Sequence, residues 1–458
     1  MKTIISTNPA KDYEKLGEVE FTSFDHIKKK VEAANKAKLA WKEFGINKRI
    51  ELLKPLIDKL EARKDEIMSL LTKEMGKTVV ESMDEFDGEV SFLKDFLKNA
   101  PEFLKDEITY EDKNEHHRVI YEPWGVAVSI VPWNFPMENF LLSTIPNLIA
   151  GNVVIFKHSE ECPLCGKIFE EIMESLDLPE GVFSEVYGDG KVGDFLTDQD
   201  INLIYFIGSS KVGNLLAEKA GKKFIKAVME MGGSNPGVVF EDVELDDDFI
   251  KGLAMSRFWI AGQVCVSMKR LIVHESIFDE VVEKLKVFVE KMKVGDPEDE
   301  STVMGSLVAK RQLDLLEEQV KDAVDKGAKI VAGGKRPEKL KGAYYLPTIL
   351  TDIKKDMRVW KEEVFGPVLP VVPFKTEEEA IELANDTIYG LGAKVFSKDV
   401  ERAVRVAEKI DTGSICINKG NSWKYYNPFG GYKKSGMGRE NGKYGFRELC
   451  QLKLISKA

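Results

Sequence analysis

Two series of short apolar runs that alternate with helix-like stretches constrain the fold of this chain more than any other feature. Strands that alternate with helices in this way form a mostly parallel sheet with helices packed against it. The first series of expected strands covers residues 126–131, 152–156, 182–187, 203–207 and 237–240. The second series covers residues 270–274, 329–332, 369–373, 393–396 and 414–417. We therefore expect two α/β units, the first of them doubly wound, with ligands bound at the carboxyl ends of the strands.

The first hundred residues are expected to be helical. Apolar side chains recur at three- and four-residue steps over residues 25–44, and residues 50–71 and 77–97 continue the pattern. Many Glu and Lys residues accompany these stretches, and we interpret that charge as solvated helix surface. A chain of 458 residues is also too long for one ordinary core, which indicates two or three domains.

The composition excludes some classes of function. A formal net charge of −11 argues against nucleic-acid binding and against an anionic substrate steered by charge. The most apolar segment, residues 140–156, is interrupted by Ser143, Pro146 and Asn147, so we expect no membrane span. The N-terminal residues lack the apolar stretch of a signal peptide, and we expect a cytoplasmic protein.

Five cysteines in such a chain do not indicate a disulfide framework. Cys162 and Cys165 form a C-x-x-C pair, but His158 is the only histidine nearby, so we expect no metal site. A redox role for the pair is the alternative to ordinary packing near a helix start, and we favour packing.

Two glycine-rich turns are candidates for phosphate binding. Residues 188–193 read G-x-G-x-x-G after an expected strand, but the acidic ribose ligand about 20 residues later is missing. Gly208 and Ser209 lie between another strand and a helix, where free backbone N–H groups can face a phosphate. Ser209 or Ser210 can equally be a plain helix N-cap.

Three residues suggest catalytic chemistry. Cys265, in Gly-Gln-Val-Cys, is by itself most simply a small buried residue. Glu230 lies between two methionines, where desolvation would raise its pKa and let it take a proton from water near neutral pH. Asn134 lies in the rigid Pro-Trp-Asn-Phe-Pro loop and is a candidate oxyanion donor.

Taken together, these motifs resemble the aldehyde dehydrogenase superfamily, from about residue 5 to the C-terminus. The remaining blocks that carry the resemblance are Glu230–Gly233, Glu363–Pro367, Pro428–Gly431 and Lys433–Glu440. The short N-terminus and the Lys157-His158 pair look closest to the succinate-semialdehyde-dehydrogenase-like branch. The resemblance implies a Rossmann-type cofactor domain, an α/β catalytic domain and a β-hairpin oligomerisation arm.

The resemblance also implies a mechanism. Cys265 would be the nucleophile that forms a thiohemiacetal and then a thioester, because sulfur attacks a carbonyl well. The Asn134 amide and the Cys265 N–H would hold the oxyanion, and hydride would pass to a nicotinamide. Glu230 would activate the water that hydrolyses the thioester. The rival is a cofactor-independent cysteine esterase or hydrolase that uses the same three residues.

The cofactor residues follow from the same resemblance. Trp133, Gly208 and Ser209 would line the pyrophosphate and adenine region, and Glu363 would bind the nicotinamide ribose with Phe365 packed nearby. Lys157 and Glu160 would bind the adenosine ribose. Since a carboxylate at residue 160 would repel a 2′-phosphate, we expect NAD, with NADP as the alternative.

The chain departs from semialdehyde-specific relatives in its substrate pocket. No arginine follows the Pro-Trp-Asn-Phe-Pro loop before Ala150. Leu142, Trp259 and Ile260 would instead line an apolar pocket that is poor at desolvating a carboxylate, which favours a neutral or hydrophobic aldehyde. Residues Lys419, Lys424, Tyr425 and Tyr426 are either a replacement anchor for a substrate carboxylate or an exposed rim.

The expected domains are as follows. Residues 1–105 and 122–229 form the cofactor domain, and residues 230–420 form the catalytic domain. Residues 106–121 and 443–458 form the arm. Because such an arm adds to a neighbouring subunit's sheet in relatives, we expect a homodimer or homotetramer.

Overall fold

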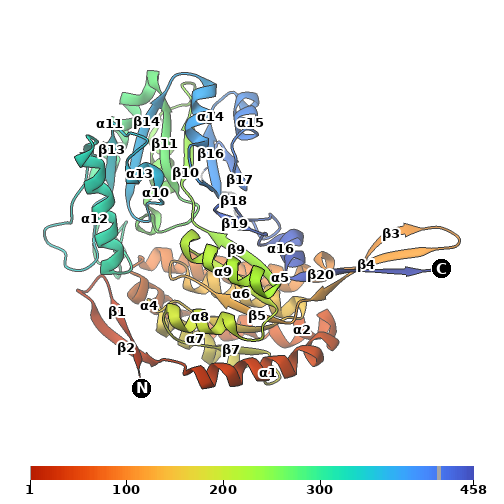
Figure 1. Cartoon of the computed structure of the whole chain (residues 1–458). Coiled ribbons are helices and arrows are strands. Elements are labelled where there is room, and N and C mark those ends of the chain that lie inside the picture. The colour runs from red at the N-terminus through yellow and green to blue at the C-terminus, as the bar shows by residue number, and fades with distance from the viewer. Residues whose placement is uncertain (1, 420–423) are drawn as a thin grey trace.

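A computed structural model describes residues 2–419 and 424–458, which form two α/β lobes and a long arm (Figure 1). The sheet of the lower lobe has the strand order β19-β9-β8-β5-β6-β7, and β19 is its only antiparallel strand. Its strands are β5 Val126–Ile130, β6 Val153–Lys157, β7 Phe183–Glu185, β8 Leu203–Gly208, β9 Lys226–Met231 and β19 Gly436–Met437. Its helices are α6 Pro136–Ala150, α7 Pro163–Glu174, α8 Gly190–Asp198 and α9 Ser210–Lys223. This is the expected doubly wound sheet, but residues 237–240, expected in the same series, are wrong for it because they belong to β10 of the other sheet.

The sheet of the upper lobe has the order β12-β13-β14-β11-β10-β16-β17, and all its strands are parallel except β12. Its strands are β10 Asn235–Val239, β11 Met268–His274, β12 Lys329–Ala332, β13 Thr348–Thr351, β14 Val368–Phe374, β16 Gly392–Phe396 and β17 Ser414–Ile417. Its helices are α10 Asp247–Phe258, α11 Phe278–Glu290, α12 Lys310–Asp325, α13 Arg358–Lys361, α14 Glu377–Asn385 and α15 Val400–Ala407. The short turns η1 Trp259–Gly262 and η2 Glu275–Ile277, and the pair β15 Tyr389–Gly390 and β18 Tyr432–Lys433, complete it.

The chain passes from the first sheet to the second between β9 and β10. Glu230 therefore belongs to the last parallel strand of the first sheet, although the expected boundary puts it in the catalytic unit. The later β19 returns to that sheet and pairs with β9, so the C-terminal part of the chain also contributes to the lower lobe.

The N-terminal region begins with a hairpin and not with a helix. Strands β1 Thr3–Asn8 and β2 Glu14–Glu20 pair antiparallel. The helices that follow are α1 Phe24–Glu43, α2 Gly45–Leu53, α3 Leu56–Ala62, α4 Lys64–Met75 and α5 Val79–Phe103. The single helix expected over residues 50–71 is wrong, because Pro55 and Arg63 interrupt it.

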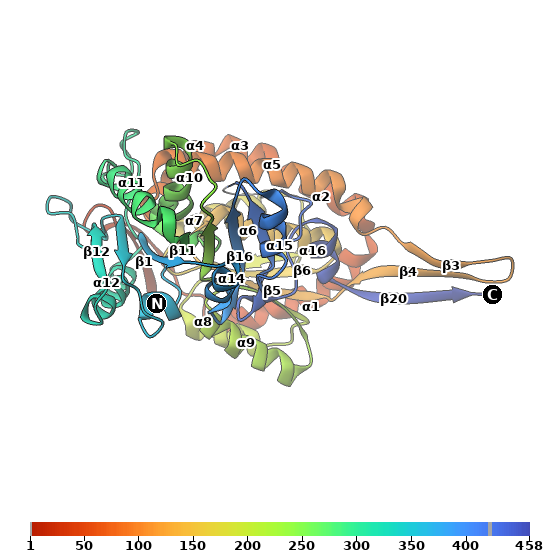
Figure 2. The ribbon, with the colours of Figure 1, turned by 90° about the horizontal axis from the view of Figure 1, so that it is seen from above.

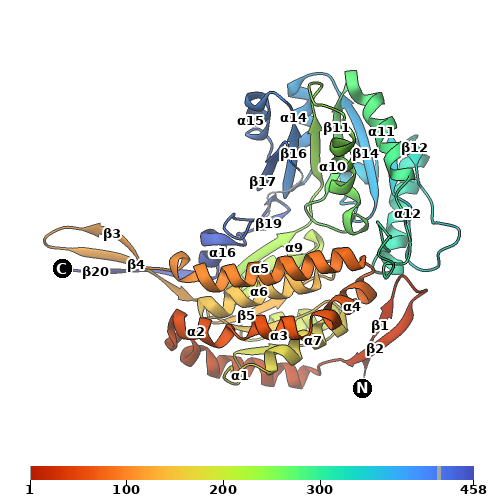
Figure 3. The same ribbon diagram turned by 180° about the vertical axis from the view of Figure 1, so that it is seen from behind.

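Helix α5 buries charge that the sequence pattern assigns to solvent. A capping box between Thr78 and Glu81 starts the helix, and the helix then lies along α6 (Figure 3). Glu81, Glu85 and Glu89 follow at four-residue steps on one face and are only 4–5% exposed. The interpretation of this charge as solvated surface is therefore wrong for this stripe of three glutamates.

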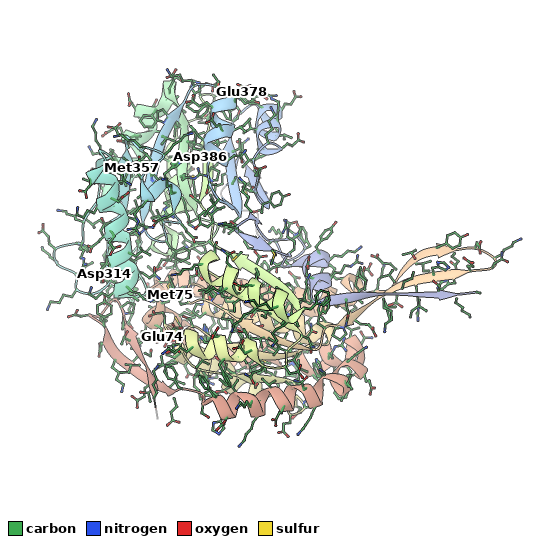
Figure 4. All side chains as sticks on the ribbon, viewed as in Figure 1. Glu74, Met75, Asp314, Met357, Glu378 and Asp386 are labelled. Atoms are coloured by element: carbon green, nitrogen blue, oxygen red, sulfur yellow. The ribbon has the colours of Figure 1, made fainter. Side chains whose placement is uncertain are left out.

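The C-x-x-C pair packs at the start of α7. Cys162 precedes the helix, Cys165 lies in its first turn, and both thiols are free and buried. Glu74, labelled in Figure 4, accepts hydrogen bonds from Ser6 Oγ at 2.5 Å and from the backbone N–H of Cys165 at 2.7 Å. No group of three or more residues suited to a metal ion occurs within residues 2–419 and 424–458.

The arm projects from one end of the molecule (Figures 1 and 2). It consists of β3 Glu107–Glu111 and β4 His116–Pro123 with β20 Cys450–Lys457 paired to β4, and α16 Gly442–Glu448 connects β20 to the lower lobe. Of the helices that the structure describes, none is long and apolar enough to cross a membrane.

Candidate active site

A cavity of about 830 Å³ lies between the two lobes. Its wall includes the loops after β5 and β8, one end of β9, the loop that carries Cys265, and residues of α5, α6 and α12. The carboxyl ends of β5, β8 and β9 are therefore at the cavity, as expected for a doubly wound sheet.

The loop that carries Cys265 has a constrained backbone. Ile260 and Ala261 both have φ of 50°, a left-handed conformation that is unfavourable for residues with a side chain. Gly262 follows with φ of 73°, and a Cβ there would lie 2.5 Å from the carbonyl oxygen of Gly366. Two donors then hold the Cys265 carbonyl: Asn235 Nδ2 at 2.7 Å and Lys269 Nζ at 2.9 Å. The backbone that carries the thiol is thus fixed before any ligand binds.

The Cys265 thiol lines the cavity and is partly buried. Burial raises its pKa to about 12, and the nearby Lys269 opposes this rise while Glu138 adds to it. At neutral pH the thiol is therefore protonated, and positive charge that enters the cavity would favour the thiolate.

Asn134 lies in the loop between β5 and α6 and lines the same cavity. Its Nδ2 donates to the carbonyl of Gln263, two residues before Cys265, at 3.2 Å. Gln263 in turn donates to the carbonyls of Ile260 and Ser306 and accepts from the N–H of Val308. This network brings the Asn134 amide to the Cys265 loop, where an oxyanion donor has to be.

Glu230 lies in β9, is 3% exposed and lines the cavity. Neither of its carboxylate oxygens has a hydrogen-bond partner among the described residues. Burial raises its pKa well above the ordinary value, repulsion by Glu440 adds to the rise, and Arg439 opposes it. A carboxylate with a raised pKa is a stronger base than an ordinary one and can take a proton from water.

Glu440, which the sequence reasoning missed as a separate site residue, also lines the cavity. It accepts a hydrogen bond from Tyr205 Oη at 2.6 Å, and burial raises its pKa to about 7. Lys269 was also missed. Apart from holding the Cys265 carbonyl, it forms an ion pair with Glu363 at 2.5 Å. Neither role has a local sequence signal, because both depend on contacts between distant segments.

One side of the cavity suits a dinucleotide. Ser209 is the N-cap of α9, and its Oγ accepts from the N–H of Val212 at 3.4 Å. The N–H groups of Ser210 and Lys211 in the same turn have no intrahelical acceptor. Residues 207–211 line the cavity together with Trp133, Glu363 and Phe365. The Trp133 and Phe365 rings pack edge to face with centroids 5.5 Å apart.

Lys157 and Glu160 are not in the wall of this cavity. Lys157 is the last residue of β6, the strand next to β5, and is 4% exposed. Its Nζ lies 3.8 Å from Glu160 Oε2. Burial lowers the Lys157 pKa, and Glu160 opposes that effect.

The other side of the cavity is less apolar than expected. Leu142 and Trp259 are in its wall, but Ile260 is not. The Ile260 side chain belongs to the buried core, and its N–H donates to Glu81 at 2.7 Å. Helices α5 and α6 add carboxyl groups to the wall beside these apolar side chains, namely those of Asp84, Glu85, Glu89 and Glu138, and the preference for a neutral or hydrophobic aldehyde stays a prediction.

A second cavity of about 650 Å³ shares Trp259, Val264, Val266 and Phe429 with the first. Lys424 lines this second cavity, and Lys419 lines a separate surface hollow. Tyr425 and Tyr426 are not in the wall of any of these cavities. Neither lysine therefore lines the cavity that contains Cys265, and residues 420–423 of the same loop lie outside the described part of the chain.

Comparison with known proteins gives one consistent result. A sequence profile of the aldehyde dehydrogenase family matches residues 1–455. The chain is 37% identical to the succinate-semialdehyde dehydrogenase (NADP(+)) of Deinococcus radiodurans, over 93% of this chain and 89% of that protein. It is 36% identical to the glutarate-semialdehyde dehydrogenase of Pseudomonas aeruginosa, over 99% and 94%.

Solved structures agree with the sequence matches. A betaine aldehyde dehydrogenase from Staphylococcus aureus, crystallised with NAD+, superimposes with a TM-score of 0.94 at 32% identity, over 99% of this chain and 91% of that one. The resemblance stated from the sequence motifs and the expected α/β fold are both confirmed.

Proposed function

The chain belongs to the aldehyde dehydrogenase family, and we propose that Cys265, Glu230 and Asn134 perform its oxidation of an aldehyde to a carboxylic acid. The observation that supports this assignment most strongly is the meeting of the three side chains in one cavity, although they come from three separate segments. The comparisons do not favour the cofactor-independent hydrolase.

NAD(P) accepts a hydride in this reaction when it is bound. The residues suited to hold it are Gly208 and Ser209 at the start of α9, with Trp133, Phe365 and Glu363 in the same wall. The N–H groups of Ser210 and Lys211 in the first helical turn, which have no intrahelical acceptor, suit a pyrophosphate. We propose that Lys157 and Glu160 hold the adenosine ribose and that NAD is preferred over NADP.

The first half-reaction begins at the Cys265 sulfur. The thiol loses its proton, and Sγ bonds to the aldehyde carbon to give a thiohemiacetal. Asn134 Nδ2 and the Cys265 N–H donate to the oxygen as its negative charge develops, an interaction whose loss typically costs about 3 kcal/mol. Hydride then leaves the carbon, and the thiohemiacetal becomes a thioester.

The second half-reaction needs a base and a water molecule. Glu230 takes a proton from water, which attacks the thioester carbon and displaces the Cys265 thiolate. The acid then leaves the cavity. The absence of a hydrogen-bond partner for either Glu230 oxygen within the described residues leaves both free for this water.

We also propose the expected assembly and compartment. The lower lobe is the cofactor domain, the upper lobe is the catalytic domain, and the arm of β3, β4 and β20 joins subunits into a dimer or tetramer. Five free cysteines suit the reducing cytoplasm.

The test of this function is formation of reduced nicotinamide with a set of aldehydes and each dinucleotide. Cys265→Ser should abolish dehydrogenase activity, whereas Cys450→Ser, a matched change of a free cysteine outside the cavity, should keep it. Full cofactor-coupled turnover by Cys265→Ser would disprove the assignment. Ester hydrolysis without any aldehyde oxidation would favour the hydrolase instead.

A further inference from the structure

The stripe of buried glutamates on α5 ends at an unsatisfied carboxyl in the cavity wall. Glu81 accepts from the N–H groups of Thr78 and Ile260. Glu85 pairs with the buried Lys77 and accepts from the N–H groups of Met137 and Glu138. These two carboxylates are therefore structural.

Glu89 differs from the other two members of the stripe. It is 5% exposed, it lines the cavity, and its Oε2 has no hydrogen-bond partner among the described residues. A buried carboxyl oxygen without a partner is costly, so the position suits a ligand group that supplies one. The residue directly before it, Gly88, also lines the cavity and leaves the wall open where another residue would place a side chain.

Glu138 adds a second carboxyl from the first turn of α6. It is half-buried and lines the same cavity. Burial raises its pKa to about 8, and repulsion by Glu85 and Glu440 adds to the rise. Burial likewise raises the pKa of Glu89, and Glu138 is the largest of the charges that add to it. The two carboxyls thus line one cavity, and negative charge on Glu138 disfavours ionisation of Glu89.

The buried positive charge that acts on both carboxyls is already paired. Lys77 is fully buried and paired with Glu85. Lys211 and Arg311, the basic residues in the wall, come from the α9 and α12 segments on the dinucleotide side. The four residues outside the described chain, 420–423, carry no charge in the sequence. No basic residue of the described wall therefore belongs to α5, α6 or the Cys265 loop.

From this geometry we propose that the natural substrate is an aldehyde with a positively charged nitrogen, held between Glu89 and Glu138 while Cys265 attacks its carbonyl. The inference rests on the proposed function, because it assigns the substrate of the same Cys265. Aromatic rings in the wall, those of Phe92, Phe135, Trp259 and Phe429, can add cation–π attraction.

A cation explains the site better than the alternatives do. An anionic semialdehyde would meet two carboxyls and no basic residue of α5, α6 or the Cys265 loop, and a hydrocarbon tail would leave Glu89 Oε2 buried without a partner. A bound ammonium would favour ionisation of both, and its charge would also lower the pKa of the Cys265 thiol, which Glu138 raises.

Isosteric substrates give a direct test. Trimethylammonioacetaldehyde and 3,3-dimethylbutanal have the same shape and differ by one charge, as do 3-aminopropanal and butanal. We expect kcat/KM for at least one cation to exceed that of its neutral partner by roughly 30-fold or more, as desolvated charge pairing predicts. Succinate semialdehyde should be a poorer substrate than that cation.

Two variants test whether Glu89 and Glu138 recognise the charge of the substrate. Glu89→Gln and Glu138→Gln should each lower kcat/KM for the cation by about 10-fold while that for butanal changes little. Glu102→Gln, an exposed glutamate on the same helix paired with Lys105, is the matched control and should change neither value. A preference for succinate semialdehyde or a neutral aldehyde, or a cation preference that survives both variants, would overturn the proposal. So would a preference for a neutral hydroxyaldehyde.

A second measurement does not depend on turnover. Choline should slow alkylation of Cys265 by iodoacetamide more than the neutral isostere 3,3-dimethylbutan-1-ol does, and Glu89→Gln should remove that difference. Equal protection by both alcohols would contradict the proposal. If no aldehyde were oxidised with either dinucleotide, the proposed function would fail, and the protection experiment would still decide whether the cavity binds cations.

Discussion

Glu230 and Glu440 are neighbouring carboxyls that the fold places in the same buried wall. Glu440 has the Tyr205 hydroxyl as a partner, whereas Glu230 has none among the described residues. Burial raises the pKa of both carboxyls, and negative charge on Glu440 raises that of Glu230 further. Ionisation of Glu440 therefore disfavours ionisation of Glu230 and makes the ionised Glu230 a stronger base.

The glutamine variant of Glu230 should separate the two half-reactions. Glu230→Gln removes the base for hydrolysis but leaves Cys265 and Asn134 in place. Steady-state turnover should fall by about 10²–10⁴-fold, the usual contribution of general base catalysis. Rapid-mixing measurements should still show a first burst of reduced nicotinamide, equal to the enzyme concentration. Loss of the burst as well would mean that Glu230 acts before the thioester.

The pH dependence of hydrolysis should depend on Glu440. Because burial raises the Glu230 pKa, the ionised base is scarce at low pH, and kcat should rise with pH above the range in which an ordinary glutamate ionises. Glu440→Gln keeps a partner for Tyr205 and removes the repulsion. The pKa of Glu230 should then fall, and the rising part of the kcat profile should move to lower pH. A profile unchanged from that of the parent enzyme would show that the two carboxyls are not coupled.

We expect Glu160 to determine the preference for NAD over NADP. It is 43% exposed and lies near the buried Lys157, so its carboxylate can accept from ribose hydroxyls or repel a 2′-phosphate. Glu160→Gln should lower the ratio of kcat/KM for NAD to that for NADP by about 10-fold, since one repulsion is removed. Glu161→Gln, the neighbouring glutamate paired with Arg311, is the control. A parent enzyme that clearly prefers NADP would contradict the assignment.

At the scale of elements, the sequence predicts those strands that form at a local run of apolar residues. Residues 126–131 and 203–207 are apolar runs, and β5 and β8 form there. Strand β9 was missed because Lys226 and Glu230 break its apolar pattern, and only pairing with β8 and β19 makes it a strand. Such pairing is a tertiary effect that a single segment does not encode.

The residues of the site were likewise predicted only in part. Asn134, Glu230 and Cys265 stand in local motifs, so the sequence identifies them and the structure brings them into one cavity. The α5 carboxyls have no motif. The four-residue spacing of Glu81, Glu85 and Glu89 is equally typical of a solvent-exposed helix face. Only the packing of α6 against α5 shows that these glutamates lie on a buried face. Pocket polarity was therefore the least predictable property.

The arm is the element whose prediction is easiest to test. In its register Leu452 faces Tyr121 and Leu454 faces Val119 across β20 and β4, so these side chains share one face. Leu452 and Leu454 are 68% and 59% exposed, so this face of the arm presents large apolar side chains to solvent. Exposed apolar surface of this kind is typical of a protein interface. Leu452→Lys combined with Leu454→Lys should give a smaller species by sedimentation velocity, whereas Lys113→Ala at the hairpin turn should not. An unchanged size would exclude the arm from assembly.

At the scale of the whole molecule, charge and local recognition act together. The chain carries a net charge of −11, and exposed Asp84 lies in the wall of the same cavity as Glu138 and Glu89. A cation approaching this wall is attracted at long range by the net charge and at short range by the carboxyls. The long-range part depends on salt, whereas the short-range part is screened much less.

Ionic strength should therefore separate these two contributions. Raising salt from about 10 mM to about 150 mM shortens the screening length from about 30 Å to about 8 Å, so kcat/KM for trimethylammonioacetaldehyde should fall several-fold at saturating NAD. The value for 3,3-dimethylbutanal should stay constant, which controls for effects of salt on folding and on the dinucleotide. Glu89→Gln should lower the cation's kcat/KM at every salt concentration but keep the slope, because one buried carboxyl contributes little to the distant field. A slope that disappears in Glu89→Gln would mean that the attraction is entirely local, and a slope of opposite sign would exclude a cationic substrate.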